Sequence, residues 1–409
     1  MPKIVYPVCC GIDVHKSFVV ACIATTNENL VTTYVRKRFS TFTGDLRRLA
    51  DWLSQNSCRD VCMESSGKYW IPVWNILEPT CNLVLAHPKY VRAIKGKKTD
   101  KRDAKWIADI FKHDLINGSF IPPADIRQLR DLVRYRVKLT SYTTGEKNRA
   151  QNCLTVSNIK LDDVFSDVFG KAASAITERL LENNEPFDVT PYLTKNIKAN
   201  PDEIQAAVDG AMCANQAEKL RIIRSHMDSL EICKANLESE ILSVSNPFLP
   251  QINLVTDVPG FKPFSAIAII GEIGVDMSVF QTSRHLCSWA GLTPQNDQSA
   301  GKKKTTRISR AGAFLKPLLI QVALGAVRTC HWLKDKYHSL KKRRGHKKAI
   351  IAIARKILTA IWHMLKKHEP YNHDLYQKSD LPPLNRVLTP AQAFALLRKQ
   401  GFQIAEHVA

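Results

Sequence analysis

Short apolar segments alternate with segments of helical spacing over the first 125 residues, and this alternation constrains the fold more than any other feature. The apolar segments are rich in β-branched residues, which favours strands at Val8–Asp13, Phe18–Ala24, Leu30–Lys37, Asp60–Glu64 and Leu83–Ala86. The first three are expected to form a meander. Helices are predicted between and after them, at Thr43–Gln55, Tyr69–Leu77 and Arg102–Leu115. We therefore predict an α/β domain over 1–125, closed by Pro122-Pro123.

The rest of the chain has mainly helical spacing. A long basic amphipathic helix is predicted over Ile126–Leu154 and a second long one over Ala217–Val244, which indicates an antiparallel or intermolecular, coiled-coil-like pair. A helical spacer is the alternative interpretation of this middle region, 126–250. A mainly helical block follows over 251–370, with helices expected at Ser265–Ile270, Ser283–Ala290, Ala313–Arg328 and His346–Lys367, and a polar basic loop at Gln295–Arg310. Residues 371–409 form a peripheral tail.

Positive charge is the unusual property of the composition. The chain has 59 Lys and Arg against 38 Asp and Glu, a net charge of +21. Between Gly301 and Lys367 there are 19 Lys or Arg and one acid, Asp335, and a second cluster runs from Lys89 to Lys105. A single basic cluster can be a solvated surface, but two dense clusters favour nucleic acid as the partner. The predicted nucleic-acid contacts are Lys97, Lys98, Lys101, Arg102, Lys302, Lys303, Lys304, Arg307, Arg310, Lys341, Lys342, Arg343 and Arg344.

Four acidic residues occupy positions that suit a metal site. Asp13 and Glu64 each end a predicted strand, and Asp100 and Asp103 lie three residues apart at a helix start, on one face. If the strand ends converge, these carboxylates meet at one edge, where their oxygens suit Mg²⁺ or Mn²⁺. Paired metals of this kind support attack on a phosphodiester.

Each acid also has a purely structural interpretation. Asp13 can be a turn residue, Asp100 can cap a helix, and Asp103 can pair with Lys101. A structural role explains less well why two of these acids lie inside a basic stretch. The histidines, including His15 and His87, show no ligand or triad spacing and are expected to be structural or exposed.

The segment Gln298–Lys304 places a serine, Ser299, beside a glycine and three lysines. Such a hydroxyl can approach a phosphate while the lysines neutralise the phosphate charge. A free serine is nevertheless a poor nucleophile without a base or metal to activate it. The alternative is that Ser299 only belongs to a basic DNA-contacting loop. The segment is not a Walker loop, because no glycine stands five residues before Gly301.

Eleven cysteines without a Cys-x-x-Cys pair argue against a structural zinc site and favour reduced thiols in a cytosol. The apolar run Ala349–Ala354 is too short to span a bilayer, so no membrane association is expected. We expect a cytoplasmic protein.

Several separated motifs together resemble the DEDD transposases of bacterial insertion sequences, the insertion-sequence one-ten family, which includes Piv-type DNA invertases. The resemblance covers roughly 1–370, and the stretch 159–215 contributes nothing to it. The motifs are Gly11–Lys16, Met63–Gly67, Lys98–Ala104, Val258–Gly260 with Gly271–Gly274, Ala290–Pro294, Ser299–Lys302, Ile308–Gly312 and Ala352–Lys356.

The resemblance implies a RuvC-like, RNase H-type N-terminal domain whose metal ligands are Asp13, Glu64, Asp100 and Asp103. It implies a C-terminal transposase domain with a helix-hairpin-helix-like element and Ser299 as nucleophile. The serine would form a covalent phosphoserine and release a 3′-hydroxyl. The resemblance also implies a structured noncoding bridge RNA that pairs with donor and target DNA, and homodimers that assemble into a tetramer. It further implies a bacterial protein associated with the nucleoid.

Two rival functions remain open on the sequence. A RuvC-like resolvase or nuclease would hydrolyse DNA with the four carboxylates, and Ser299 would only bind. A non-catalytic nucleic-acid-binding protein would use the same basic surfaces and would not need Asp13 or Glu64. A fold alone cannot choose between them, because RNase H-type folds host several chemistries.

Overall fold

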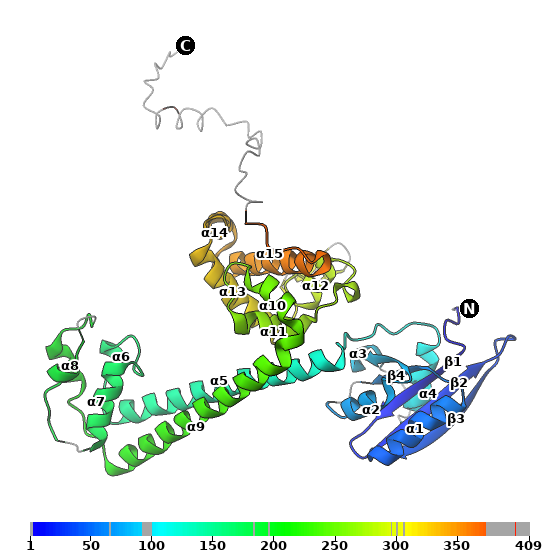
Figure 1. Cartoon of the computed structure of the whole chain (residues 1–409), viewed down its shortest axis with the longest axis horizontal. Coiled ribbons are helices and arrows are strands. Elements are labelled where there is room, and N and C mark those ends of the chain that lie inside the picture. The colour runs from blue at the N-terminus through cyan, green and yellow to red at the C-terminus, as the bar shows by residue number, and fades with distance from the viewer. Residues whose placement is uncertain are drawn as a thin grey trace. The chain divides into compact units, whose positions relative to one another are not determined.

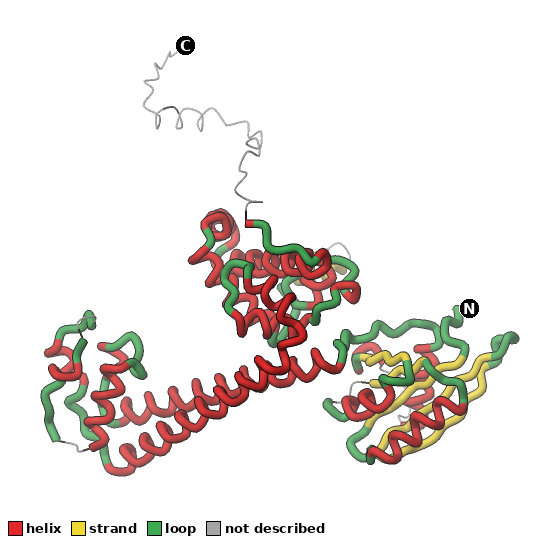
Figure 2. The backbone as a smooth tube through the Cα atoms, viewed as in Figure 1, coloured by secondary structure: helices red, strands yellow, loops and turns green. Residues whose placement is uncertain are grey.

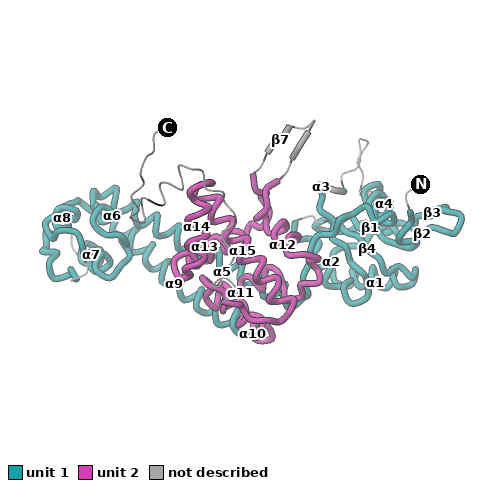
Figure 3. The backbone as a smooth tube through the Cα atoms, turned by 90° about the horizontal axis from the view of Figure 1, so that it is seen from above, with its two compact units in different colours: residues 1–244 teal, residues 245–409 magenta. Residues whose placement is uncertain are grey.

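A computed structural model describes residues 3–64, 67–91, 100–182, 185–194, 197–295, 297–299, 302–305, 307–373 and 397. For 89–90, 100–101, 297–299 and 302–305 only the backbone is described. The chain forms two compact units, residues 1–244 and 245–409, which Figure 3 shows in different colours. The five-stranded sheet lies in the N-terminal part of the first unit, and helices make up most of the rest (Figure 2).

The N-terminal sheet is mixed, with the strand order β3-β2-β1-β4-β5. The first three strands form the expected antiparallel meander, and β4 and β5 continue the sheet parallel to β1. Because β1 pairs with β4, the chain must cross over between parallel strands, and helices make these crossings. The strands are β1 (Val8–Val14), β2 (Phe18–Thr26), β3 (Thr32–Ser40), β4 (Asp60–Glu64) and β5 (Asn82–Ala86).

Helices cover both faces of this sheet (Figure 1). Alternate strand residues point to opposite faces, so Ile12 and Met63 pack against α1 (Thr43–Gln55) and α2 (Trp70–Leu77). The α1 residues Leu46, Leu49 and Leu53 are fully buried there, and burial of each contributes about 1.5–3 kcal/mol. The other face packs against α4 (Asp100–Phe111), and a short α3 (Pro88–Val91) precedes it.

Two long helices, α5 (Ala124–Val156) and α9 (Ala214–Ser245), pack side by side in antiparallel directions. Arg136 of α5 forms an ion pair of 2.6 Å with Glu238, and Glu146 accepts a contact of 3.1 Å from His226. The partner number on α9 falls as the number on α5 rises, which establishes the antiparallel direction. An antiparallel pair within one chain is one of the two arrangements that the periodicity allowed.

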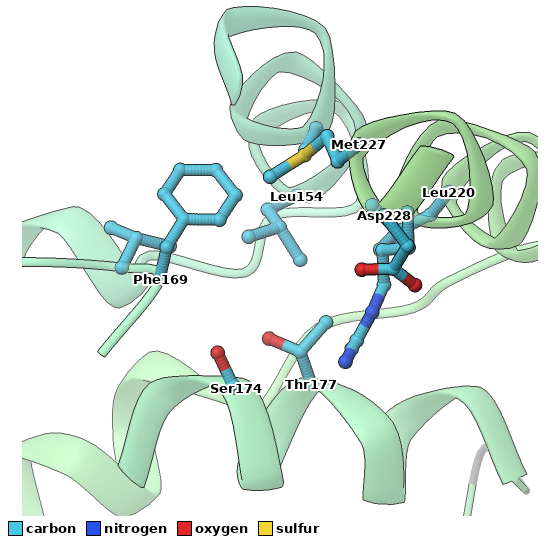
Figure 4. Close-up of a pocket in the computed structure, with 10 residues that line it drawn as sticks. Leu154, Phe169, Ser174, Thr177, Leu220, Met227 and Asp228 are labelled. Carbon is cyan, nitrogen blue, oxygen red and sulfur yellow. The ribbon is translucent and has the colours of Figure 1, made fainter. Parts of the chain in front are cut away.

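The region between these helices packs with the adjoining ends of α5 and α9 around one hydrophobic core. It contains α6 (Leu161–Val164), α7 (Lys171–Glu182), the 3₁₀ helix η1 (Thr190–Tyr192) and α8 (Pro201–Ala207). A pocket of about 160 Å³ lies between α5, α7 and α9, with Thr177, Leu220 and Asp228 among its lining residues (Figure 4). None of the acids predicted from the sequence lines it.

The second unit is built around α15 (His346–Lys367), whose apolar side is buried against its neighbours. Its other elements are η2 (Asn246–Phe248), α10 (Leu249–Thr256), α11 (Pro263–Ile273), η3 (Met277–Val279), α12 (Ser283–Trp289), β6 (Asp297–Ser299), β7 (Lys302–Thr305), α13 (Leu315–Thr329) and α14 (His331–Arg344). Across the described residues, no helix has the length and apolar character that a membrane span requires.

Two features of this unit differ from expectation. The segment expected to be a loop over 295–310 contains an antiparallel ribbon in which Ser299 pairs with Lys302. Such a ribbon gives no alternating apolar signal because its residues are polar. Helix α14 was not predicted either, since only Leu333 and Tyr337 are buried along it. Nearly all of the predicted tail lies outside the described residues.

Candidate functional site

Asp13 and Glu64 lie on the same face of the sheet, at the ends of adjacent parallel strands. The register pairs Ile12 with Met63, so the next residues of the two strands are Asp13 and Glu64. Ile12 and Met63 point to the α1 face, and the strand alternation therefore turns both acids to the α4 face. Asp13 is buried and Glu64 is half-buried.

Gly11 allows α4 to lie directly on this face. A Cβ atom at Gly11 would stand 2.4 Å from the Ala104 carbonyl oxygen and 2.4 Å from the Ala108 nitrogen, so only glycine permits this approach. Cys9, two residues earlier on β1, donates from Sγ to the Ala108 carbonyl at 3.6 Å. Residue numbers along α4 therefore fall as residue numbers along β1 rise. The first turn of α4 consequently lies toward Asp13.

That first turn carries the other two predicted acids. Helix α4 begins at Asp100, one helical turn before the buried Ala104, and Asp103 follows at the same end. Asp103 is half-buried, and for Asp100 the backbone alone is described. The sheet and α4 therefore bring the positions of all four acids to one end of one face.

His15 contacts this group, which the sequence did not predict. Its Nε2 lies 3.1 Å from an Asp13 carboxylate oxygen. The centre of its ring lies 4.6 Å from the centre of the Phe18 ring. The contact arises because β1 turns into β2 here, with the His15 N–H donating to the Phe18 carbonyl at 2.9 Å. A histidine two residues after a strand-ending aspartate was the available signal.

A polar network fixes the outer side of α4 to strand β3. Tyr34 donates to an Asp109 carboxylate oxygen, and the same oxygen accepts from Lys112 at 2.8 Å. Burial lowers the pKa of Lys112, but the hydrogen bonds to Asp109 and Tyr34 outweigh it and leave this pKa above its ordinary value. The charged lysine is therefore held against the carboxylate, and the network orients α4 on the sheet.

The basic residues predicted to bind nucleic acid are distributed over both units. Arg102 lies exposed in the first turn of α4, and Arg307 and Arg310 are exposed after β7. Lys341, Lys342, Arg343 and Arg344 are all exposed at the C-terminal end of α14, where cations favourably meet the helix dipole.

The other predicted residues are described less fully. Ser299 lies on β6, and Lys302, Lys303 and Lys304 lie on β7, each known by its backbone. The side chain of Lys101 is not described, and Lys97 and Lys98 lie outside the described residues. Among the side chains that are described, no three His, Cys, Asp or Glu groups are close enough to hold a metal ion together.

Two family models match this chain. Residues 10–159 match a model of the DEDD domain of IS110 proteins, described as a transposase. Residues 252–338 match a model described as Transposase IS116/IS110/IS902 family. The first match contains Asp13, Glu64 and the first turn of α4, and the second contains the β6–β7 ribbon.

Similarity to individual known proteins supports the same family. The chain is 23% identical over 298 residues to the transposase for insertion sequence element IS1111A of Coxiella burnetii, a match that covers 70% of this chain and 72% of that one. It is 29% identical over 166 residues to the pilin gene-inverting protein of Moraxella bovis, which covers 38% and 49% of the two chains. Both the predicted family and the enzyme class are confirmed: the chain belongs to the IS110/IS116/IS902 family of transposases.

Proposed function

We propose that this transposase is an RNA-guided, metal-dependent serine DNA recombinase that moves its own insertion sequence. One observation carries the chemical part of the proposal. The register and the α4 packing bring Asp13, Glu64 and the helix turn that holds Asp100 and Asp103 to one end of one sheet face. Acids gathered this way in a chain with a charge of +21 suit chemistry on a phosphodiester.

The proposed division of labour follows the predicted segments. Residues 1–125 would be a RuvC-like catalytic domain, which agrees with the mixed sheet covered by helices on both faces. Residues 126–250 would be the coiled-coil-like dimerisation region, built on the α5–α9 pair. Residues 251–370 would be the transposase domain, with α10, the turn at Gly260 and α11 as its helix-hairpin-helix-like element. The tail 371–409 would be peripheral.

The donor set fits a hard divalent cation. All four proposed ligands are carboxylates, and oxygen ligands are those that Mg²⁺ and Mn²⁺ prefer. When bound, such an ion supplies charge stabilisation for the phosphate oxygens and activates a nucleophilic oxygen. The closely packed α4 backbone over Gly11 would hold the helix-borne acids in position relative to the strand-borne ones.

The proposed cleavage step uses Ser299 as the nucleophile. Its Oγ loses a proton and bonds to the phosphorus, while the bond from phosphorus to the 3′ oxygen breaks and that oxygen takes up a proton. The products are a phosphoserine on the 5′ side and a free 3′-hydroxyl. A 3′-hydroxyl from another strand reverses the step, so no external energy source is required. The β6–β7 ribbon supports this role because it pairs Ser299 with a lysine strand.

The basic residues of the second unit would position nucleic acid through its phosphates, while base pairing with the RNA would choose the sites. Replacing Lys302, Lys303 and Lys304 together with glutamine is expected to weaken DNA binding and to reduce its salt dependence. An unchanged salt dependence would show that these lysines do not contact phosphate. Two protomers joined through the long helices, and two such dimers, would supply the active sites that a four-strand exchange requires.

A covalent adduct trap tests the serine step. Purified protein, Mg²⁺, the RNA encoded beside the gene and a junction DNA substrate are combined and separated on a denaturing gel. We expect wild type to give a protein–DNA adduct and Ser299→Ala to give none. Ser309→Ala serves as the matched control, because this serine lies in the same basic segment and should leave the adduct intact.

Cleaved DNA without adduct in either protein would overturn the serine mechanism. It would favour a RuvC-like nuclease in which the carboxylates direct hydrolysis by water and Ser299 only binds. Adduct that persists in Ser299→Ala would instead move the nucleophile to another residue.

A further inference from the structure

A stack of side chains leads from the candidate acids to the edge of the sheet. His15 contacts Asp13 at 3.1 Å and packs on Phe18, and the guanidinium carbon of Arg38 lies 3.8 Å from the centre of the Phe18 ring. Arg38 belongs to β3, which is first in the strand order and so forms an edge of the sheet. The aromatic ring holds this exposed guanidinium in a defined place beside the acids.

The register puts Arg38 in line with Asp13. Arg38 pairs with Val20 on β2, and Val20 pairs with Asp13 on β1. Two inter-strand spacings separate the backbones of Arg38 and Asp13 by about 10 Å, which corresponds to about three nucleotides of one strand of B-form DNA. A phosphodiester backbone that passes the acids therefore reaches Arg38 within a few nucleotides.

Two further cations continue this surface on the same face. Arg36 pairs with Cys22 and lies two residues from Arg38, so both arginines point to the α4 side. Lys105 belongs to α4, the helix that covers this face, and its Nζ lies 4.0 Å from the centre of the Tyr34 ring of β3.

The surface is not neutralised by neighbouring acids. No ion pair within the described part of the chain involves Arg36, Arg38 or Lys105, and Asp109, one helical turn after Lys105 on α4, is bound to Lys112 and Tyr34. Both arginines are exposed. Three cations arranged in this way beside a carboxylate group complement the charge of a phosphate backbone.

We propose that Arg36, Arg38 and Lys105 bind the phosphodiester backbone of the DNA strand that enters the acidic end of the sheet. The Phe18–His15 stack holds Arg38 at a fixed distance from Asp13, so the arginine would help set which phosphate reaches the acids. The proposal takes the location of the active site from the proposed function, but its test measures binding and needs no cleavage.

The test compares the salt dependence of DNA binding in matched variants. Full-length wild type, Arg36→Gln/Arg38→Gln and Lys37→Gln are titrated with a fluorescein-labelled DNA duplex at several salt concentrations without divalent metal. Lys37 is the matched control because it lies between the two arginines but points to the α1 side, over the Phe39 ring. The melting temperature of each protein establishes that it is folded.

We expect the double variant to lower the slope of log affinity against log salt by about 1.8, since each phosphate contact contributes about 0.9. Between about 50 and 200 mM salt, the wild type should then lose about 12-fold more affinity than the double variant. The Lys37→Gln variant should have a slope nearer to that of wild type than the double variant has. The charge-preserving Arg36→Lys/Arg38→Lys variant should restore the slope.

A photo-crosslink identifies the occupant. Arg38 is replaced by p-benzoylphenylalanine, with the same replacement of Lys37 as control, and the protein is irradiated with labelled DNA duplex and labelled RNA hairpin together. Crosslinking to DNA from position 38 and not from position 37 is expected. Equal slopes for the double variant and Lys37→Gln, or crosslinking to RNA alone, would overturn the proposal. Either result would leave the adduct experiment unaffected, so the two proposals fail separately.

Discussion

Gly11→Ala should separate α4 from the sheet that carries the acids. The added Cβ would stand 2.4 Å from two backbone atoms of α4 and 3.0 Å from a third, the carbonyl carbon of Ile107. Backbone atoms cannot turn aside as a flexible side chain can. Ordinary contact begins at 3.4 Å, so α4 must retreat by about 1 Å along its closest approach.

This displacement has a calculable cost. Forcing an extra methyl group into such a contact lowers the free energy of unfolding of the domain by about 2–3 kcal/mol. Amide hydrogens that exchange only when the whole domain unfolds should therefore exchange roughly 30 to 150 times faster. A shift of about 1 Å between catalytic groups costs about 100-fold in rate. Hydrogen exchange followed by mass spectrometry over β1 and α4, together with strand cleavage, measures both effects in one preparation.

Gly44→Ala provides the matched control. A Cβ atom at Gly44, near the start of α1, meets nothing within 4 Å. Alanine there should stabilise by up to about 1 kcal/mol, because glycine loses more chain entropy in a helix. Gly11→Ala with wild-type exchange and wild-type cleavage would refute the reasoning that the contact between α4 and β1 positions the acids.

Two further predictions concern the first unit. Arg127 donates to Glu78 at 2.6 Å and holds the pKa of that carboxyl below its ordinary value of 4.5. The pair therefore stabilises the folded protein above pH 4.5, and this stability is lost as the pH falls through the lower pKa of the folded state. The difference in melting temperature between wild type and Arg127→Gln should therefore shrink over that acid range, and a constant difference would contradict it. Iodoacetamide should modify the exposed Cys213 and Cys233 first, because burial raises the pKa of the Cys9 thiol to about 12. Mass spectrometry that finds Cys9 modified first would contradict this order.

The elements with strong apolar periodicity were predictable from the sequence. Helices α1 and α15 and strand β4 have the predicted bounds, because each buries a continuous apolar side. The helix predicted over 102–115 instead spans Asp100 to Phe111, and the chain soon leaves helical geometry at Asp114, whose φ is +55°. The β6–β7 ribbon escaped prediction because its residues carry no apolar alternation.

The acids of the site could be listed from the sequence, but the contacts around them could not. Strand ends and helix starts are local features, so Asp13, Glu64 and Asp103 stand out as single positions. The contact of His15 with Asp13 depends on the turn that joins β1 to β2. The place of Arg38 depends on the register between β2 and β3, which joins residues distant in the sequence.

Binding of Mn²⁺ most directly tests the claim that these acids form one metal site. The ion is titrated into full-length protein without nucleic acid and followed by its electron paramagnetic resonance signal. Asp60→Asn is the control, because Asp60 lies at the opposite end of β4 from Glu64. We predict that wild type and Asp60→Asn bind the ion and that Asp13→Asn and Asp103→Asn do not. Undiminished binding in both of these variants would contradict the account.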